Sequence, residues 1–89
     1  MNVNVQFFGK FRKLTARRDQ MVALREGAQL ANLLEHLSQE YGADFRNELS
    51  NKNQIHILVN GQYHSILDDI RTQLKDGDMV VLMPLATGG

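Results

Sequence analysis

The residues best placed to do chemistry are the last two, Gly88 and Gly89. The sequence predicts a free α-carboxylate on Gly89, which is ionised at neutral pH because the pKa of such a group is about 3.3–3.7. Glycine adds no packing and loses more conformational freedom on folding than any other residue. Two glycines are therefore a poor way to finish a fold but a good way to make a thin arm. We expect residues 86–89 to form a flexible tail that places its carboxylate in the active site of another protein.

A carboxylate at the end of such a tail supports one kind of acyl chemistry. It is a poor acyl donor by itself, because oxide is a very poor leaving group. It can, however, act as a nucleophile and attack the α-phosphate of ATP. The resulting acyl-adenylate has a good leaving group, so a sulfur nucleophile can displace AMP and leave a thiocarboxylate.

Other candidate sites in the sequence are weak. His64 and Ser65 are neighbours on an expected strand, so their side chains point to opposite faces and do not meet. Among His36, His56 and His64 only the last two are expected to come near each other, whereas a structural metal site needs four ligands. The chain has no Cys, which excludes disulfides and thiolate metal sites. We expect no metal and no tightly bound cofactor, and we expect the paired acids Asp68-Asp69 to cap a turn.

Composition narrows the class of protein. The 89 residues suffice for one small domain. Ten basic and ten acidic side chains cancel, which argues against nucleic acid as the main partner. No apolar run approaches the ~20 residues of a membrane span, and the first residues lack the pattern of a signal peptide. The expected compartment is the cytoplasm.

The first half of the chain predicts two strands and a helix. Residues 1–7 alternate apolar and polar side chains as a half-buried strand does, and residues 20–24 form a second short strand. Residues 9–19 are basic and polar and are interpreted as a loop. Residues 30–41 carry leucines at helical spacing and form the most secure helix, although its start lacks a Ser, Thr, Asp or Asn cap. Phe45 and Leu49 are one helical turn apart, which indicates a short second helix.

The second half predicts three further strands. Residues 55–59 alternate, and Asn60-Gly61 is the strongest two-residue hairpin signal, because a type I′ turn needs positive φ at both positions. Residues 62–66 would form the return strand. Residues 79–85 are apolar on both faces, so we place them centrally in the sheet. Pairing should fail near Pro84, which has no N–H to donate.

This order of elements fits the α+β class, with a mixed sheet packed on one main helix, as in the β-grasp or ubiquitin-like fold. We expect a β-grasp domain over residues 1–85 followed by the tail at 86–89. In this fold the first and last strands run parallel at the centre, so their C-terminal ends lie together. Partner-binding residues beside the root of the tail would then be Phe8, Lys10, Phe11, Arg12, Met83, Pro84, Leu85 and Thr87.

The last strand carries more apolar residues than one helix can cover. Val80 and Leu82 alternate with Val81, Met83 and Leu85, and both sets cannot face the helix. Either loops cover the second set, or the outer face of the sheet is a docking patch for a partner. We favour the docking patch, because a tail donor must hold its partner while it reacts.

The whole chain resembles the MoaD/ThiS family of ubiquitin-like sulfur carriers. The resemblance rests on several motifs in order: Val5-Gln6-Phe7-Phe8-Gly9-Lys10-Phe11-Arg12, Gly27 with Leu30, Leu33 and Leu34, Val59-Asn60-Gly61, Leu74-Lys75-Asp76-Gly77-Asp78, Pro84 and Gly88-Gly89. The opening motif, the length and the proline before the glycines resemble MoaD, the small subunit of molybdopterin synthase, more than they resemble the shorter ThiS of the thiamine pathway. MoaD tails often carry two consecutive prolines, whereas Leu85 follows Pro84 here.

The resemblance implies a carrier that is not itself an enzyme. A separate MoeB/ThiF-like adenylating enzyme would use ATP to activate Gly89, and a MoaE-like large subunit would hold the pterin that accepts the sulfur. Gly88 would pass through the channel of the partner. Two alternatives stay open on the same tail: a sulfur carrier for thiamine, tRNA thiolation or cysteine synthesis, and a ubiquitin-like modifier joined to proteins through Gly89.

Overall fold

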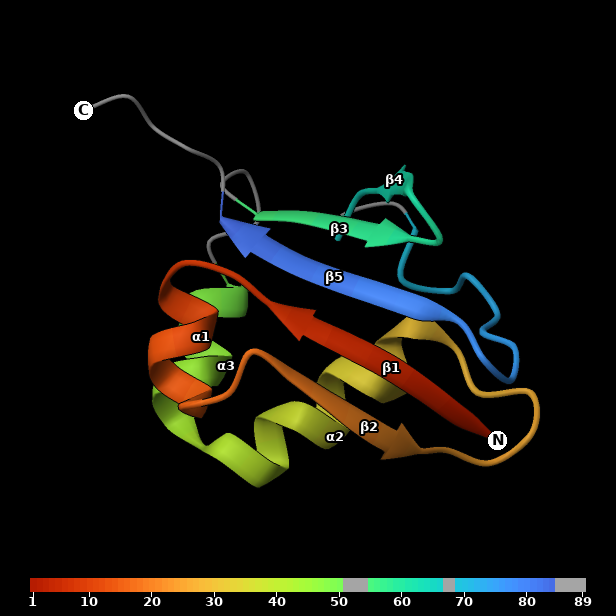
Figure 1. Ribbon diagram of the computed structural model, residues 1–89, viewed down its shortest axis with the longest axis horizontal. Helices are drawn as coiled ribbons and strands as arrows, with labels where there is room; N and C mark the ends of the chain where they lie inside the picture. Colours follow the sequence, from red (N-terminus) through yellow and green to blue (C-terminus); the bar gives the residue numbers. More distant parts are fainter. Residues whose placement is uncertain (51–54, 67–68, 85–89) are drawn as a thin grey trace.

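Five strands form one mixed sheet in the described residues, which are 1–50, 55–66 and 69–84 of a computed structural model (Figure 1). The order across the sheet is β2-β1-β5-β3-β4. The strands are β1 (Asn2–Phe7), β2 (Asp19–Ala23), β3 (Ile55–Val59), β4 (Gln62–His64) and β5 (Met79–Pro84). The helices are α1 (Lys10–Thr15), α2 (Leu30–Tyr41) and α3 (Ala43–Leu49).

The centre of the sheet is the parallel pair of β1 and β5. Their register runs from Asn4 opposite Met79 to Phe7 opposite Leu82. β2 flanks β1 and β3 flanks β5, both antiparallel. The expected β-grasp arrangement, with the first and last strands parallel at the centre, is confirmed.

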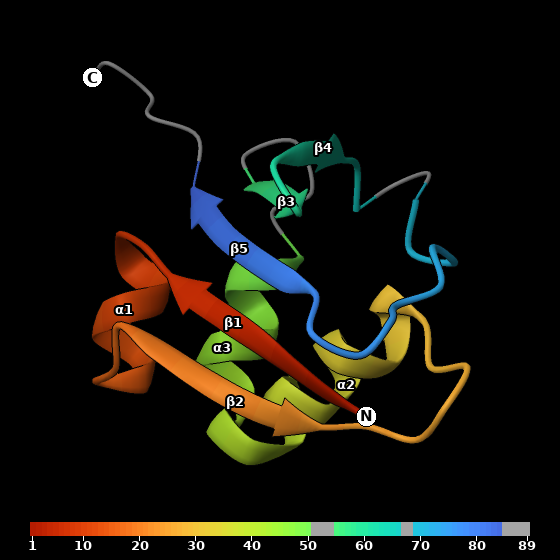
Figure 2. The same cartoon turned by 45° about the vertical axis from the view of Figure 1, so that its right-hand side comes forward.

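The core lies between one face of the sheet and the helices α2 and α3, which Figure 2 shows on the same side of the sheet. Alternate residues of each strand face this core, as the sequence pattern predicts. The fully buried members include Val3, Val5 and Phe7 of β1, Val80 and Leu82 of β5, Ile57 of β3, and Leu30, Leu33 and Leu37 of α2. The described residues contain no buried polar side-chain atom without a hydrogen-bond partner.

Local signals placed the helix α2 and the β3–β4 hairpin correctly. Asn60 and Gly61 both have positive φ, 51° and 83°, as a type I′ turn requires. The return strand β4 is shorter than expected and ends at His64. The backbone at the start of α2 has a hydrogen-bond partner that was not expected. The side chain of Asn32 accepts a hydrogen bond of 2.8 Å from the Gln29 N–H.

The segment after β1 corrects one expectation, because it contains the helix α1 instead of a loop throughout residues 9–19. Phe11 and Leu14 stand one turn apart and pack on the core, Phe11 fully buried and Leu14 half-buried. The Thr15 hydroxyl donates to the Phe11 carbonyl at 2.9 Å. Ala16 then ends the helix with a left-handed φ of 57°. Tertiary packing of Phe11 thus outweighed a basic, polar local sequence.

The first prediction concerns the packing of α2 on the sheet. Leu33→Ala should lower the free energy of unfolding by about 2–5 kcal/mol, because it leaves a cavity at a fully buried position. Leu33→Met keeps the volume and should cost less than about 1.5 kcal/mol. Urea unfolding followed by circular dichroism measures both. Equal stability of the alanine variant and the original chain would place this face of α2 outside the core.

Candidate functional site

The connection from β1 to α1 lies against the end of β5, as the topology predicted. The Phe8 N–H donates to the Leu82 carbonyl at 3.0 Å, one step beyond the last β1–β5 pair. Gly9 lies so close to the ring of Pro84 that a Cβ at position 9 would be 2.6 Å from Pro84 Cγ. Figure 1 shows the same proximity of the β1–α1 segment to the tip of β5. The predicted residues around Phe8 and Pro84 therefore meet at one end of the sheet.

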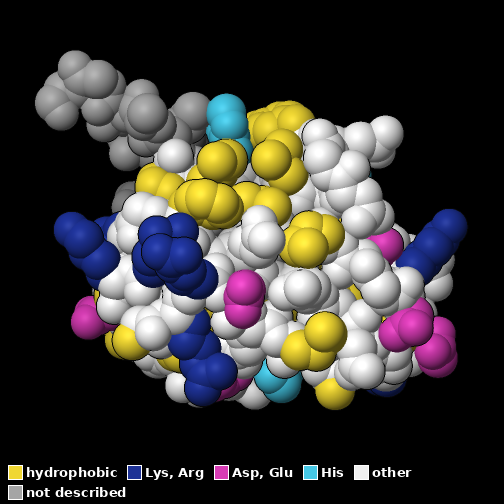
Figure 3. All heavy atoms as spheres, viewed as in Figure 1, with side chains coloured by type: hydrophobic (Ala, Val, Ile, Leu, Met, Phe, Trp, Pro, Cys, Tyr) yellow, Lys and Arg dark blue, Asp and Glu magenta, His cyan; other side chains and the backbone are white. Residues whose placement is uncertain are grey.

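The outer face of the sheet, on the side away from α2, carries an apolar strip. The register pairs Met21 of β2 with Asn4, which also pairs with Met79. It also pairs Val81 with Leu58. We call the following set the outer apolar face: Phe8, Met21, His56, Leu58, Tyr63, Met79, Val81 and Met83. The polar residues Asn4 and Gln6 of β1 share this side of the sheet and lie between Met21 and β5. Figure 3 shows hydrophobic side chains gathered over β5 and its neighbours on this side.

Exposure on this face bears on one of the two interpretations of the apolar excess, namely coverage by loops. Val80 and Leu82 are fully buried on the inner face, so Val81 and Met83 are the set that the helices do not cover. Phe8 is 37% exposed, Met21 62% and Tyr63 55%. Within the part of the chain that the structure describes, loops do not cover this face. An apolar strip of this kind on a small domain is typical of a protein-binding surface.

Arg12 holds Phe8 at the edge of the outer apolar face. The guanidinium carbon lies 5.4 Å from the centroid of the Phe8 ring, within cation–π range. The Arg12 Nε donates to the Phe7 carbonyl at 3.3 Å. The side chain of Arg12 is thus tied to the end of β1 and covers one face of the Phe8 ring.

Phe11 is a correction to the predicted docking set. Its side chain is fully buried. Its ring lies 5.3 Å from that of Phe45. A ring enclosed in this way offers no surface to a partner. Phe11 anchors α1 from beneath, and through α1 it supports Phe8, Lys10 and Arg12.

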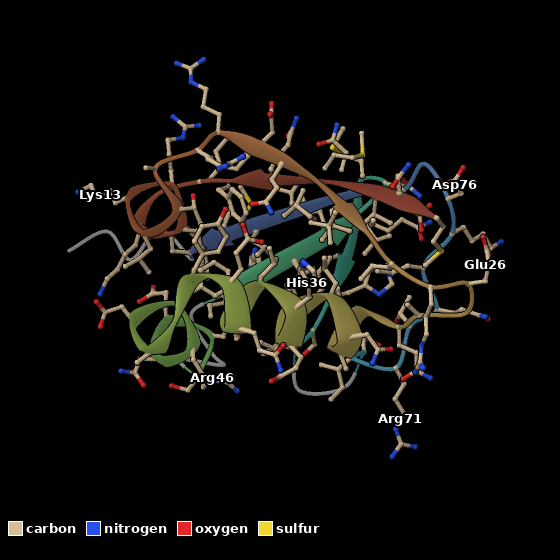
Figure 4. All side chains as sticks on the ribbon, turned by 90° about the horizontal axis from the view of Figure 1, so that it is seen from below. Lys13, Glu26, His36, Arg46, Arg71 and Asp76 are labelled. Carbon is tan, nitrogen blue, oxygen red and sulfur yellow. The ribbon has the colours of Figure 1, made fainter. Side chains whose placement is uncertain are left out.

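Charge is unevenly spread along the long axis of the molecule. Lys13, Arg17 and Arg18 follow Arg12 at the α1 end, and none of them forms an ion pair within the described ranges. The Lys10 Nζ lies 3.4 Å from Oε1 of Glu48 in α3 and forms an ion pair with it. Figure 4 shows Lys13 at this end and Glu26 and Asp76 at the opposite end. Several unpaired cations therefore lie at the end of the sheet where β5 ends, and such groups favour an acidic partner surface.

Among the described residues, the two groups with clearly shifted pKa values, Glu35 and Tyr41, belong to the helical layer. The pKa of Glu35 is lowered by its hydrogen bonds and charge interaction with Arg46. Burial raises the pKa of Tyr41, whose hydroxyl donates to the side chain of Gln20. Both groups lie on the side of the sheet away from the outer apolar face. They hold α2 to α3 and to β2, and they take no part in the candidate site.

The histidines do not form a common site. His56 lies on the outer face with its ring 4.9 Å from that of Tyr63. His64 pairs with Ile57 and so faces the opposite side, where its Nδ1 lies 3.3 Å from the Thr72 hydroxyl. The expectation that these two histidines come near each other is therefore wrong. Successive residues of a strand point to opposite faces, and His64 lies opposite Ile57, the neighbour of His56. Among the described residues no three His, Cys, Asp or Glu side chains could hold a metal ion together.

Two further findings concern the alternatives raised by the sequence. Asp69 accepts a hydrogen bond of 2.7 Å from the Ser65 N–H and closes the turn after β4, as expected of one of the paired acids. Asp68 lies outside the described residues.

In the described ranges, the helices are all too short or too polar to cross a membrane.

Part of the predicted site lies outside the described residues, namely Leu85, Thr87, Gly88 and Gly89. The same holds for the boundary between the domain and the tail. Sequence reasoning also missed members of the outer apolar face, above all Met21, Leu58 and Tyr63. Alternation within each strand gave the signal for Leu58. Only the strand order could show that Leu58 and Tyr63 line up with Val81, and that Met21 lies across Asn4 from Met79.

Comparison with known proteins gives one family and several similar folds. The ThiS family matches residues 5–89. The small archaeal modifier protein 3 of Haloferax volcanii is 27% identical over 92 residues, covering 100% of both chains. A structure described as a putative molybdopterin converting factor, subunit 1, from Pyrococcus furiosus has a TM-score of 0.76 and 26% identity, covering 97% of this chain and 99% of that one. The structure of SAMP1 from Haloferax volcanii has a TM-score of 0.79 at 18% identity over 100% of both chains.

Proposed function

The chain belongs to the ThiS family of small ubiquitin-like carriers, and on that premise we propose that it is a sulfur carrier that reacts through Gly89. The observation that carries the proposal is the outer apolar face, which reaches the end of β5 and the Phe8–Arg12 pair there. A partner bound to this face would stand directly beside Pro84, the last described residue of β5. The carrier would thus hold its partner with one surface and react with the segment next to it.

The reaction would proceed in two displacements on a partner enzyme. A carboxylate oxygen of Gly89 attacks the α-phosphorus of ATP, and the bond to the pyrophosphate breaks. A sulfur nucleophile then attacks the acyl carbon, and the bond to AMP breaks, which leaves a thiocarboxylate. This chain would supply the reactive end and the docking face, and a MoeB/ThiF-like enzyme would supply the ATP site and any catalytic base.

The acceptor of the sulfur is proposed to be the pterin precursor of molybdopterin, with the chain as the small subunit of a synthase and a MoaE-like protein as the large subunit. Two observations support this choice. The motif Phe8-Gly9-Lys10-Phe11-Arg12 resembles the start of MoaD. The Pyrococcus furiosus protein described as a molybdopterin converting factor is 26% identical over nearly the whole of both chains.

A second candidate function is that of a protein modifier. It is favoured by the full-length similarity to a Haloferax volcanii protein named as a modifier. Here the amine of a target lysine would displace AMP from the same acyl-adenylate in place of sulfur. Intact-mass spectrometry of the protein from its own host separates the two, because one oxygen exchanged for sulfur indicates a carrier and adducts on lysines indicate a modifier.

The second prediction concerns docking through the outer apolar face. Phe8→Ala removes an exposed ring, so the melting temperature should change little while the affinity for the adenylating enzyme falls by about tenfold, as expected for loss of an aromatic anchor worth about 1–2 kcal/mol. Isothermal titration calorimetry measures the affinity. Arg71→Ala is the matched control, because Arg71 is exposed at a distance from this face (Figure 4). Equal affinities for the two variants would move the docking surface elsewhere.

The third prediction concerns the reactive end. Deleting Gly89 moves the carboxylate back by up to about 3.6 Å along an extended chain. A misplacement of 1 Å can cost about 10²-fold in rate, so ATP–pyrophosphate exchange with the adenylating enzyme should fall by at least that factor. The melting temperature and the affinity should stay close to those of the full chain. Exchange at an undiminished rate would show that Gly89 is not the reacting residue.

A further inference from the structure

The strand β2 forms one margin of the described sheet and pairs with a neighbour on one side only (Figure 1). Its antiparallel pairing with β1 runs residue for residue from Asn2 opposite Ala23 to Gln6 opposite Asp19, with no bulge. The strand contains no Pro, Gly or Lys. The opposite margin, β4, spans only three residues. Proteins block sheet edges with very short strands, bulges, prolines and charges, and β2 carries only the charge of Asp19.

The hydrogen bonds between β1 and β2 show which backbone groups of β2 point away from the sheet. The Leu24 N–H donates to the Met1 carbonyl at 2.8 Å, and the Phe7 N–H donates to the Arg18 carbonyl at 2.8 Å. In an antiparallel pair, residues that bond the partner strand alternate with residues whose N–H and C=O point the other way. The residues of β2 with outward N–H and C=O are therefore Asp19, Met21 and Ala23.

Exposure and the hydrogen bonds of β1 agree with this assignment. Asp19, Met21 and Ala23 are all exposed. Asn4, which lies opposite Met21, donates its N–H to the Asp78 carbonyl at 2.9 Å on the β5 side and not to β2. In the part of the chain that the structure describes, the outward groups of β2 have no hydrogen-bond partner. The edge thus offers a row of free donors and acceptors to an added strand.

The charges along this edge select a partner and a register. An antiparallel pairing of two β2 strands about a two-fold axis at Val22 would set Asp19 of each copy opposite Arg25 of the other. Both side chains are exposed, and neither forms an ion pair within the described ranges. A register centred on Met21 would instead set Arg17 opposite Arg25, and like charges directly opposite each other are destabilising.

The register centred on Val22 also matches the backbone groups. It sets Met21 of each copy opposite Ala23 of the other, and both residues belong to the outward set. Two such residues exchange both of their N–H···O bonds in an antiparallel ladder. One register therefore satisfies the backbone bonds and the charges together, and the two-fold axis repeats each contact.

Two properties of the chain favour contact between copies. Side chains hold β2 in place from its inner side, because the Gln20 amide donates to Glu40 at 2.8 Å and also accepts a hydrogen bond from the Tyr41 hydroxyl. An edge that is already ordered lowers the entropic cost of binding. The formal net charge of the chain is +0, so two copies do not repel each other as whole molecules.

We propose that the edge of β2 is the site at which a second copy of this chain adds its own β2, so that the two sheets join into one. The inference goes beyond the proposed function and does not depend on it. Met21 and Ala23 supply the hydrogen bonds, and Asp19 with Arg25 fixes the register. Paired residues project to the same side of the joined sheet, so both outer apolar faces lie on one side and the helices on the other. Each copy thus keeps its outer apolar face open to a different partner.

The first measurement is the concentration dependence of association in the original chain. Sedimentation equilibrium should show a monomer–dimer equilibrium with a Kd of about 0.1–1 mM, because a joined edge buries less surface than a standard interface. Amide hydrogen exchange identifies the surface. The amides of Met21 and Ala23 should exchange freely in dilute protein and become protected as the dimer forms, whereas the amide of Val22, which bonds β1, should be protected throughout.

The second measurement tests the register by exchanging charges. Asp19→Arg and Arg25→Asp each set like charges opposite one another twice, so each variant alone should dimerise at least about tenfold more weakly. A mixture of the two variants restores opposite charges at both places, and its heterodimer should have a Kd within about threefold of that of the original chain. Asp44→Arg changes the net charge equally on the exposed side of α3 and should leave the Kd within about twofold.

The third measurement removes one outward donor. Ala23 lies opposite Asn2 in a pair that is not hydrogen-bonded, so Ala23→Pro deletes an N–H that points to solvent and spares the ladder to β1. The Kd should rise about tenfold, because each copy loses one hydrogen bond across the contact, while the melting temperature of the dilute monomer changes little. Ala23→Ser keeps the N–H and is the matched control, with a Kd within about twofold of the original.

A chain that stays monomeric at about 2 mM, with the Met21 and Ala23 amides unprotected, would overturn the proposal and leave the edge to a segment of another protein. Dimerisation that is undiminished in Ala23→Pro would also overturn it, as would a mixture of the charge variants that associates no better than either alone, because the contact would then lie elsewhere. If Ala23→Pro does not fold, the charge variants carry the test. Failure of the proposed carrier function would appear in ATP–pyrophosphate exchange, which none of these measurements uses.

Discussion

The parallel pairing of β1 with β5 is the constraint on which the rest of this structure depends. Parallel strands end at the same edge of a sheet, so the residues after Phe7 must meet the residues after Leu82. This brings the start of α1 against Pro84 although the two are far apart in the sequence. An antiparallel pairing of the same strands would place the β1–α1 connection at the opposite end, away from the segment that carries Gly89.

The strand β5 serves stability and recognition on its two faces. Val80 and Leu82 are fully buried against the helical layer, whereas Val81 and Met83 belong to the outer apolar face. Because successive side chains of a strand point to opposite faces, a substitution on one face leaves the side chains of the other face unchanged. A central strand that is apolar on both sides would normally be covered twice. Here the second covering layer is proposed to be the partner protein.

Among the described residues, the ionisable groups with shifted pKa values lie in the helical layer and not on the outer apolar face. The shifted pKa values of Glu35 and Tyr41 arise from contacts that tie the helices together, away from the outer apolar face. At the α1 end, cations such as Lys13 and Arg17 are exposed and unpaired in the described structure. These groups can attract and orient an acidic protein surface. Under the proposed function, the chemistry would take place on the partner, and this fold would supply a rigid base for its reactive end.

The sequence by itself determined the elements whose signals are local. Leucine spacing predicts α2, and Asn60-Gly61 predicts the hairpin, because helical periodicity and positive φ are properties of a few adjacent residues. Together with the order of elements they predicted the β-grasp fold and the meeting of Phe8 with the end of β5. Tertiary structure decided the rest. It turned the segment after β1 into α1 by burying Phe11, which removed that ring from the docking surface. It also set Gly9 against Pro84, a contact invisible in the sequence because it depends on the register of two distant strands.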